Sequence, residues 1–541
     1  MILVADVPTK RLVFLREATG LVRGISPFNA LVTTVILTNY GLGMATFEAY
    51  TPYLWPGADL GTAAFFAIPF VLLNALLYIW FTEAMPRSGG DYVWITRITT
   101  PSIAVGFIFI YVLYQALFWG SLVNYTVSYF LGSGIATMGF ALNNPGLTAS
   151  SAFFATNAAI IGIGTVIIVA MTGLLLIPLR QYLRYQLAMW ILGVISILIS
   201  ILLYASSSQA SFASTFNADF QRYNTTYTGV ISQAHSLGFV NPGLVSFGVP
   251  TLFATAFMFI SLNGFQMGAY FGGELKGARK SMYVAGFLGG LISVIFFAVV
   301  GYTFQGVVGA TFVNALSYIQ NTNPSLYTLP IPWNNFFFSL LLTNNPVLIV
   351  LMIVGLFAWG ISGLAAIGLV CSRILLAAGF DRTLPSKLGN VSDRFHTPVF
   401  AVILYMVLVE FGLVVSVYAG VIFGALNFTL VLTGLYAFVG FVAIIYPYRR
   451  KDLFESSSVA RYKVGGVPAI SLVGLANLIL FSFLFYFSLQ NPAMGGPTGA
   501  PALETLGGVF VLGIIAYYAT KAYYRKKGID ISLAMAQIPP E

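Results

Sequence analysis

Charged side chains are scarce in this sequence. Asp, Glu, Lys and Arg make up only 8% of its 541 residues, whereas soluble domains carry about 25%. No part of the sequence is polar enough to be a soluble domain. A multidomain soluble protein and a separate soluble catalytic domain are therefore excluded.

Cysteine and histidine are almost absent. The single cysteine, Cys371, excludes a disulfide framework within the chain and any multi-thiolate metal site. The two histidines, His235 and His396, fall in expected loops on opposite sides of the apolar spans described below. No Walker A sequence or zinc spacing occurs, and no His, Cys and acidic side chains share one depth. We therefore expect no enzyme, no catalytic residues, no metal and no cofactor beyond a coupling ion.

Long apolar runs fill most of the chain, which is 58% hydrophobic. A helix needs roughly 20 apolar residues to cross the hydrocarbon core of a membrane. Twelve runs meet this length, with outer loops expected at 207–249 and 310–344. The expected spans are 27–50, 61–82, 103–131, 152–177, 187–206, 250–272, 284–309, 345–378, 398–418, 421–446, 467–489 and 504–524.

The basic residues lie almost entirely on one side of these spans. Of the 25 Lys and Arg residues, only Arg222 falls on the other side. Because the loops that stay in the cytoplasm retain Lys and Arg, both termini are expected in the cytosol and the chain in the cell membrane. The net charge of +9 then reflects contacts with the lipid bilayer rather than with nucleic acid.

Two of the spans contain residues that interrupt helices. The first carries Asn-Tyr-Gly-Leu-Gly at 39–43, and the sixth carries Ser-Leu-Asn-Gly-Phe-Gln at 261–266. A helix break inside a membrane leaves backbone groups unpaired unless they line a cavity or meet a ligand. Interrupted helices at equivalent positions of two halves are typical of a transporter binding site. Close packing of helices on small residues remains the alternative.

The two interrupted spans divide the chain into five parts. Spans one and six would each open a five-helix repeat, at 27–206 and 250–446. A cytoplasmic segment, 1–26, precedes the first repeat, and an extracytoplasmic loop, 207–249, separates the two. The remainder, 447–541, holds a cytoplasmic loop, helices eleven and twelve, and a short cytoplasmic C-terminus.

Short motifs between the spans resemble those of the amino acid–polyamine–organocation permeases. Residues 86–92 (PRSGGDY) are similar to the loop after the family's second helix, and 273–281 (GELKGARKS) to the exit from its sixth. The Ser-Arg pair at 372–373 with 379–385 (GFDRTLP), and the amino-terminal LREATG at 15–20, also match. Together they run in the family's order from about residue 15 to 400.

The resemblance implies an all-α integral membrane fold. It would have about 12 transmembrane helices, in a five-plus-five inverted repeat (LeuT-like) with two additional C-terminal helices. The implied activity is secondary transport of amino acids or related amines, by symport or antiport. Gln266 stands where the family often has an acid, so a neutral or zwitterionic substrate is favoured over a cation.

The helix breaks suit a zwitterion. Free amides at Gly41–Gly43, at the positive end of a half-helix, would bind a carboxylate. Exposed carbonyls of residues 260–262 would accept from an α-ammonium group, so no side-chain charge need be buried. The expected substrate-binding residues are Tyr40, Gly41, Leu42, Gly43, Phe259, Ile260, Ser261, Leu262, Asn263, Gly264 and Gln266.

The driving ion is left open by the sequence. The fifth span lacks the lysine that some members of the family are thought to use in place of sodium. Ser362 in the eighth span is a candidate sodium ligand, although membrane serines often bond to their own helix. Proton coupling, sodium coupling and ion-free exchange all remain open.

Charged side chains of the motifs are candidates for a cytoplasmic gate. The expected pairs are Asp91 with Arg87, Glu274 with Arg279 or Lys280, and Asp381 with Arg373 or Arg382. The alternative for each is a solvated basic loop. Glu410, in the middle of the ninth span, is expected to make a structural bond or an interface rather than to couple transport.

Two other functions stay open. An amino-acid-binding sensor would bind the same ligand without turnover, and a transporter of the same fold could carry another organic solute. The expected partners are a small-molecule amino acid or related amine and the lipid bilayer, and the sequence leaves a homo-oligomer open.

Overall fold

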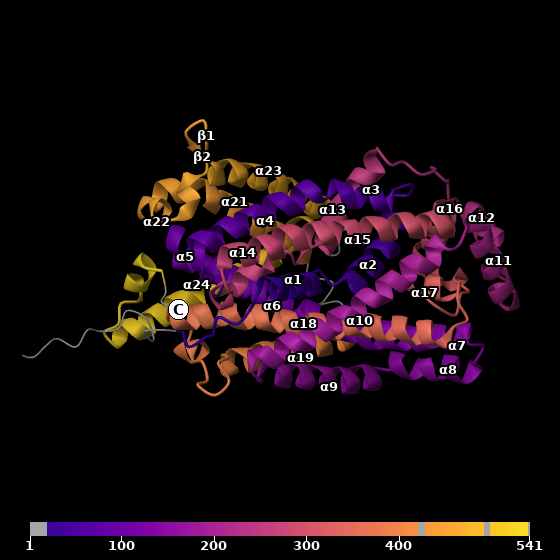
Figure 1. Ribbon diagram of the computed structural model, residues 1–541, viewed down its shortest axis with the longest axis horizontal. Coiled ribbons are helices and arrows are strands. Elements are labelled where there is room, and N and C mark those ends of the chain that lie inside the picture. The colour runs from indigo at the N-terminus through magenta and orange to yellow at the C-terminus, as the bar shows by residue number, and fades with distance from the viewer. Residues whose placement is uncertain (1–18, 420–427, 492–497, 539–541) are drawn as a thin grey trace, which may run out of the picture.

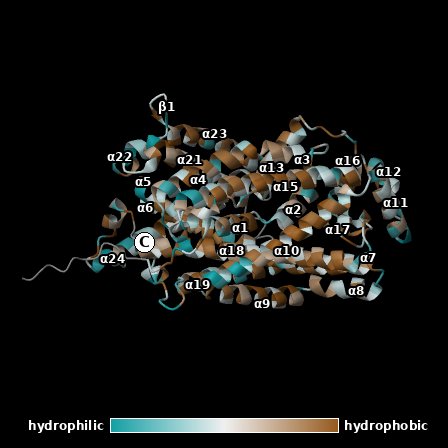
Figure 2. Ribbon diagram, in the orientation of Figure 1, coloured by the Kyte–Doolittle hydropathy of each residue, from teal (hydrophilic) through white to brown (hydrophobic). Residues whose placement is uncertain are grey.

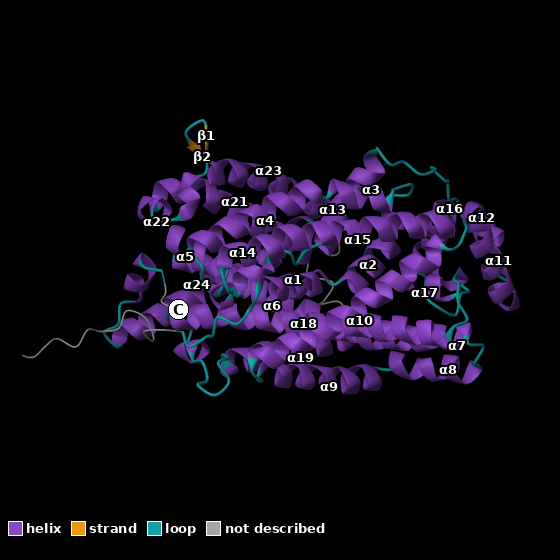
Figure 3. Cartoon of the chain, viewed as in Figure 1, coloured by secondary structure: helices purple, strands orange, loops and turns teal. Residues whose placement is uncertain are grey.

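The computed structural model describes residues 19–419, 428–491 and 498–538. These are almost entirely helical (Figure 3), and the one pair of strands among them is a short hairpin, β1 (Lys463–Val464) with β2 (Val467–Pro468). The long helices run along one common direction (Figure 1). This is the all-helical architecture that the apolar runs predict.

Ten helices in the described residues are long and apolar enough to cross a membrane, and each coincides with an expected span. They are α3 with α4 (Leu60–Phe66 and Ile68–Ala84), α6 through α7 (Pro101–Ala141), α9 (Asn157–Leu175), α10 (Leu179–Ala205), α14 through α16 (Ala278–Thr322), α18 (Pro346–Phe380), α19 (Val399–Tyr418), α21 (Phe428–Arg449), α23 (Ala469–Gln490) and α24 (Gly499–Lys526).

The two remaining expected spans are the interrupted ones. The first is split into α1 (Pro27–Thr38) and α2 (Tyr40–Leu54), and its axis bends by 49° further on, between Pro27–Ala45 and Phe47–Leu54. The sixth is only the 13-residue helix α13 (Val249–Ser261), followed by the short turns η4 (Met267–Tyr270) and η5 (Gly272–Glu274). Counting the bent pair gives up to eleven spans, so twelve crossings and the repeat arrangement stay predictions.

The interrupted helices lie at the centre of the molecule. α1 packs against α10, α15 (Gly289–Phe304) and α18, and its residues from Ala30 to Thr38 are all buried. α24 and α10 lie at the periphery. Of the most apolar stretch of each helix, only 11% is buried inside the protein in α24 and 28% in α10. Since those outer surfaces are apolar (Figure 2), they suit contact with lipid.

The two ends of the bundle differ in their loops. One end carries the C-terminus, α5 (Asp91–Ile98), α22 (Lys451–Glu455) and the hairpin (Figure 1), and we call it the basic end. The other end carries α8 (Pro145–Ser150), α11 (Gln209–Phe220), α12 (Tyr227–Ser236) and α17 (Asn335–Leu340). Arg222 follows α11 directly.

The long outer loops expected at 207–249 and 310–344 are largely helical. The first contains α11 and α12, and in the second the preceding helix continues as α16 (Ala310–Thr322) before α17. Buried phenylalanines explain the difference. Phe212 and Phe216 of α11 pack edge-to-face against Phe312 of α16. The polar composition of these segments therefore gave no sign of the aromatic core that they form.

Candidate functional site

The two helix breaks lie directly against each other. α1 ends at Asn39, whose backbone is left-handed (φ 48°, ψ 69°), and α2 begins one residue later. Gly264, just after α13, has φ 149°, and a Cβ atom built on it would lie 2.4 Å from the backbone nitrogen of Thr38. Only glycine permits this approach, so Gly264 fixes how the breaks meet.

The break in the first span lies earlier than the glycines suggest. Gly41 and Gly43 fall in the first turn of α2, and the Gly43 amide donates to the Asn39 carbonyl at 2.8 Å. The expectation of a free amide at Gly43 was therefore wrong. The backbone amides at the start of α2, from Tyr40 on, precede the first hydrogen bond within that helix.

Carbonyl groups face this helix start from the sixth span. α13 ends at Ser261, and Leu262 donates its amide to Met258 at 2.9 Å. The carbonyls that follow, those of residues 259–261, lie at the negative end of that helix. The Ser261 oxygen lies 3.1 Å from the position of a Cβ on Gly43. A positive helix end and a negative helix end thus meet.

The polar side chains of the sixth break are bonded to one another. Gln266 donates through Nε2 to the Asn263 Oδ1 atom at 2.6 Å and to the Tyr436 hydroxyl, which itself donates to Asn263 Oδ1 at 2.5 Å. The Gln266 Oε1 atom accepts from the Gly264 amide at 3.4 Å. Gln266 and Tyr436 are completely buried. This triad, Asn263–Gln266–Tyr436, ties the break to α21.

Aromatic rings surround the meeting point. Tyr40 donates its hydroxyl to Ser293 at 2.8 Å, and its ring centroid lies 5.1 Å from that of Trp359 in α18. A Cβ on Gly41 would lie 3.1 Å from the Trp359 side chain. The buried ring of Phe259 lies 5.0 Å from that of Phe481 in α23. Phe259 therefore packs in the core.

Ser362 lies one turn further along α18. Its buried hydroxyl donates to the Trp359 carbonyl of its own helix at 3.3 Å. A serine in a membrane helix often makes this bond, which is the alternative to binding sodium. The next residue, Gly363, lies near the first break, because a Cβ on it would lie 3.0 Å from the Asn39 Nδ2 atom.

The charged motif residues meet at the basic end, with partners that the sequence did not predict. Arg373 of α18 donates to both carboxylate oxygens of Glu274, at 2.9 and 3.1 Å, and both side chains are almost fully buried. Glu274 was expected to pair with Arg279 or Lys280. Arg279 instead lies near Glu83, at 3.5 Å, and Tyr462, with half of its side chain exposed.

A second buried pair joins Asp381 to Arg97 of α5. The two bonds measure 2.5 and 2.8 Å, and the Tyr92 hydroxyl donates to the same carboxylate at 2.8 Å. Asp381 was expected to pair with Arg373 or Arg382. Arg97 was not expected in the site. A basic residue in an otherwise uncharged segment just after 86–92 was the available signal.

In place of the third expected pair, Asp91 with Arg87, the structure has a hydrogen bond from a tyrosine to Asp91. Asp91 accepts from the Tyr270 hydroxyl at 2.5 Å, whereas Arg87 donates to the Pro86 carbonyl at 2.9 Å. Burial raises the pKa of Asp91 to about 7, although the Tyr270 hydrogen bond acts in the opposite direction. We call the two ion pairs, Glu274–Arg373 and Asp381–Arg97, together with Asp91–Tyr270 the basic-end network.

Two glycines of the PRSGGDY segment allow it to pack closely against the basic-end network. Gly89 (φ 114°) lies against Ala377 of α18, with 2.6 Å from a Cβ position to the alanine Cβ. Gly90 (φ 52°) lies against the Tyr270 ring, at 2.4 Å. Both positions have left-handed backbone and no room for a side chain. The PRSGGDY loop is therefore shaped to dock between α18 and η4.

Glu410 makes the structural bond expected of it. The Thr165 hydroxyl of α9 donates to its carboxylate at 2.7 Å, which links α9 to α19. Glu410 lies away from both breaks in sequence and in packing, since α19 contacts α6, α9 and α18.

A bundle of apolar helices with two interrupted helices meeting at its centre defines a multi-pass membrane transporter rather than an enzyme. The family comparison gives the particular family. The model of the amino acid permease family matches residues 28–515, and the chain belongs to that family, within the amino acid–polyamine–organocation superfamily. No curated protein matches the chain.

Proposed function

We propose that the protein is a secondary active transporter that moves neutral or zwitterionic amino acids by alternating access. The observation that supports this most directly is the opposition of the two helix ends. The α2 start, at residues 40–42, faces the last carbonyls of α13, and Gly264 holds them together. The substrate carboxylate would bind the amides and the α-ammonium group the carbonyls.

The preference for an uncharged side chain rests on the triad. Asn263, Gln266 and Tyr436 are neutral, and the Asn263 oxygen already accepts from both of the others. A cationic side chain would need a carboxylate to offset its desolvation. The triad offers none, so we propose that small neutral amino acids bind best.

Alternating access would use the networks at the two ends. At the basic end, α18 is tied to η5 through Arg373 and Glu274. At the other end, the buried Glu48 of α2 accepts from the backbone amide of Asn335 at 2.9 Å, which ties α2 to α17. We propose that one set of bonds breaks as each side opens.

We propose that both termini lie in the cytosol and that the protein resides in the cell membrane. The basic end would then be the cytoplasmic end. Residues 27–206 and 250–446 would be two inverted repeats followed by α23 and α24. We further propose that a proton or sodium ion drives uptake, with Ser362 as a candidate sodium ligand.

The test is uptake of labelled amino acids into proteoliposomes that contain the purified full-length chain. We expect saturable accumulation of neutral amino acids under an inward proton or sodium gradient, and the gradient required identifies the ion. Stimulation only by preloaded amino acids would assign exchange. Ligand binding without any movement would contradict transport and indicate a sensor. Accumulation of a non-amino-acid solute alone would contradict the substrate class.

A further inference from the structure

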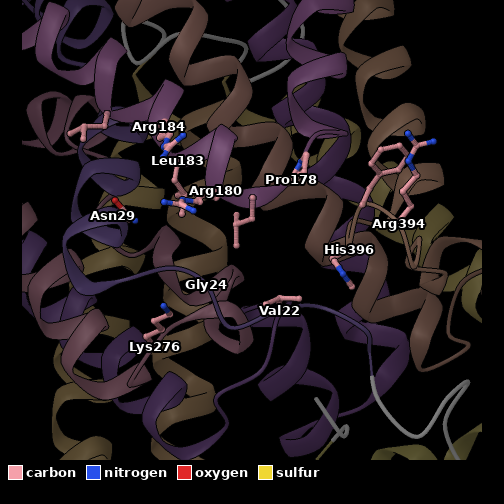
Figure 4. A pocket seen from close by; sticks show the side chains of 13 residues that line it. Val22, Gly24, Asn29, Pro178, Arg180, Leu183, Arg184, Lys276, Arg394 and His396 are labelled. Carbon is pink, nitrogen blue, oxygen red and sulfur yellow. The ribbon is translucent and has the colours of Figure 1, made fainter.

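A cleft of about 560 Å³ opens at the basic end, apart from the helix breaks. It lies between residues 22–29, which lead into α1 and begin it, the start of α10, the segment after η5 and the loop before α19. These four segments supply its 13 lining residues (Figure 4). Neither the proposed substrate path nor the basic-end network uses this cleft.

The charges of the cleft all have one sign. Arg180, Arg184, Lys276 and Arg394 line it together with His396, and no Asp or Glu does. In Figure 4, Arg180, Arg184 and Lys276 lie on one side, with His396 and Arg394 across from them. Among the described residues, none of the four Lys and Arg side chains forms an ion pair.

This arrangement differs from the other arginines of the same end. Arg97 and Arg373 are each neutralised by a carboxylate at hydrogen-bonding distance. Four unneutralised cations around one hollow repel each other, and an anion between them removes that repulsion. A phosphate group, with its several acceptor oxygens, matches converging Arg and Lys donors.

The walls of the cleft favour a lipid as the source of that phosphate. Leu183 and Leu187 line it on the same helix face as Arg180 and Arg184, because residues three and four apart share a face. Among the described helices that could span a membrane, α10 is one of the least buried. Only 28% of its most apolar stretch is buried inside the protein. Further along α10, the apolar side chains of Ile191, Leu198 and Leu202 are exposed on the outer surface of the bundle.

We propose that the cleft is a phosphate-binding site occupied by the headgroup of an anionic phospholipid from the leaflet at the basic end. Basic pockets between membrane helices bind such headgroups. The acyl chains would lie along α10. A bound lipid would contact the segment before α1, the start of α10 and the segment after η5 together, and would therefore stabilise the folded protein.

The experiment is native mass spectrometry of the purified full-length protein in detergent, with phosphatidylglycerol or phosphatidylcholine added. The cleft variant is R180Q/R184Q/K276Q, in which three exposed side chains keep their hydrogen-bonding capacity and lose their charge. The matched control is R525Q/K526Q/K527Q, which removes three exposed charges from the end of α24. Thermal melting of each variant without added lipid verifies that it folds.

Wild type and control should retain phosphatidylglycerol in preference to phosphatidylcholine, and the cleft variant should bind it roughly tenfold or more weakly. Phosphatidylglycerol should also raise the melting temperature of wild type and control but not of the cleft variant. Equal binding by wild type and cleft variant, or equal losses in cleft variant and control, would overturn the site.

Inorganic phosphate added to the protein with phosphatidylglycerol bound distinguishes the two sources. If it displaces no lipid at millimolar concentration, the membrane supplies the phosphate as proposed. Cleft-dependent binding of inorganic phosphate with no preference for phosphatidylglycerol would support the phosphate site and overturn the lipid as its occupant. Should the triple variant melt well below wild type, the single variant K276Q, in a loop, repeats the comparison.

Discussion

Gly264 is the residue on which the meeting of the two breaks depends. Gly264→Ala should abolish amino acid uptake, because its Cβ would lie 2.4 Å from the Thr38 nitrogen and the positive φ disfavours any side chain. The displaced backbone should also lower the stability by about 1–3 kcal/mol. Uptake into proteoliposomes and substrate-induced melting shifts measure both effects.

The control for Gly264 is Gly162→Ala in α9. That glycine is helical, and a Cβ on it meets nothing within 4 Å. Alanine there should leave uptake unchanged and stability equal or slightly higher, since alanine favours a helix over glycine by about 1 kcal/mol. Wild-type substrate affinity in Gly264→Ala would show that the substrate binds elsewhere.

The triad makes Gln266 sensitive to charge as well as to shape. Gln266→Glu introduces a carboxylate that cannot donate to Asn263 or Tyr436, so two hydrogen bonds are lost in a fully buried place. We expect a loss of about 1–3 kcal/mol, seen as a lower melting temperature, rather than a simple gain of cationic substrates. Tyr436→Phe removes only the hydroxyl. It should lose affinity for neutral amino acids and melt at a temperature between those of wild type and Gln266→Glu.

An unchanged melting temperature in Gln266→Glu would show that the carboxylate finds other partners. A new preference for lysine or arginine would then assign Gln266 to the substrate side-chain pocket. The melting temperature and the substrate preference are both measured on the same purified proteins.

Asp91 should make stability depend on pH. Its folded pKa of about 7 lies above the ordinary value of 3.8, because the carboxyl is buried. The phenols of Tyr78, Tyr111 and Tyr270 lie around this carboxyl, and Tyr270 donates to it. The folded state therefore binds more protons than the unfolded state between pH 4 and 7.

Stability should consequently fall as pH rises toward 7, by up to about 1.4 kcal/mol per pH unit, and level off above it. Asp91→Asn should reduce this fall and keep the bond from Tyr270. Melting temperatures of both proteins from pH 5 to 8 provide the measurement. Parallel pH profiles would mean that Asp91 is already ionised in the folded protein at pH 5.

At the scale of elements, two ion pairs join helices that are distant in the sequence. Removing one partner of a buried pair costs about 3–5 kcal/mol, because the other charge is left uncompensated. Glu274→Gln should therefore destabilise the protein by this amount and impair uptake. Glu274→Gln with Arg373→Met should recover much of the stability but not the transport.

Glu455→Gln is the matched control for that pair. Glu455 bonds to Lys451 at 3.6 Å, with both side chains mostly exposed, and such a pair contributes about 0.5 kcal/mol or less. Melting and uptake of the three variants should thus separate buried from exposed pairs. A Glu274→Gln protein as stable as the control would mean that Arg373 finds another partner.

The elements themselves were largely predictable from local sequence. Ten helices coincide with expected apolar spans, because a membrane helix must be apolar over its whole length. The interruptions near Asn39 and after Ser261 were also predicted, since glycine and asparagine weaken a helix locally. The first break lies within the expected segment 39–43, where Asn39 adopts the left-handed backbone.

Partners across the molecule could not be predicted in the same way. The motifs were expected to hold neighbouring charges together, yet Glu274 bonds to Arg373 and Asp381 bonds to Arg97. Tyr436 and Tyr270 had no local signal at all. Which charge meets which depends on how α18, α5 and η5 pack, and sequence spacing does not determine that packing.

At the scale of the whole molecule, the distribution of basic residues argues for one orientation. In the expected topology, all Lys and Arg residues other than Arg222 fall on the side of the spans that holds the C-terminus. Retention of positive loops would place that side in the cytosol. The cysteine content makes this testable, because the single native cysteine, Cys371, is buried.

Gln221→Cys places an exposed thiol beside Arg222, and Lys526→Cys places one at the end of α24. In intact cells, a membrane-impermeant maleimide should label Gln221→Cys fully. It should label Lys526→Cys only after the membrane is permeabilised, and wild type should stay unlabelled because Cys371 is inaccessible. The reverse pattern would place the basic-end network and the proposed lipid cleft outside the cell, and equal labelling of both would indicate mixed orientation. Since an inward gradient acts on the outer face, this result also decides which end must open first during uptake.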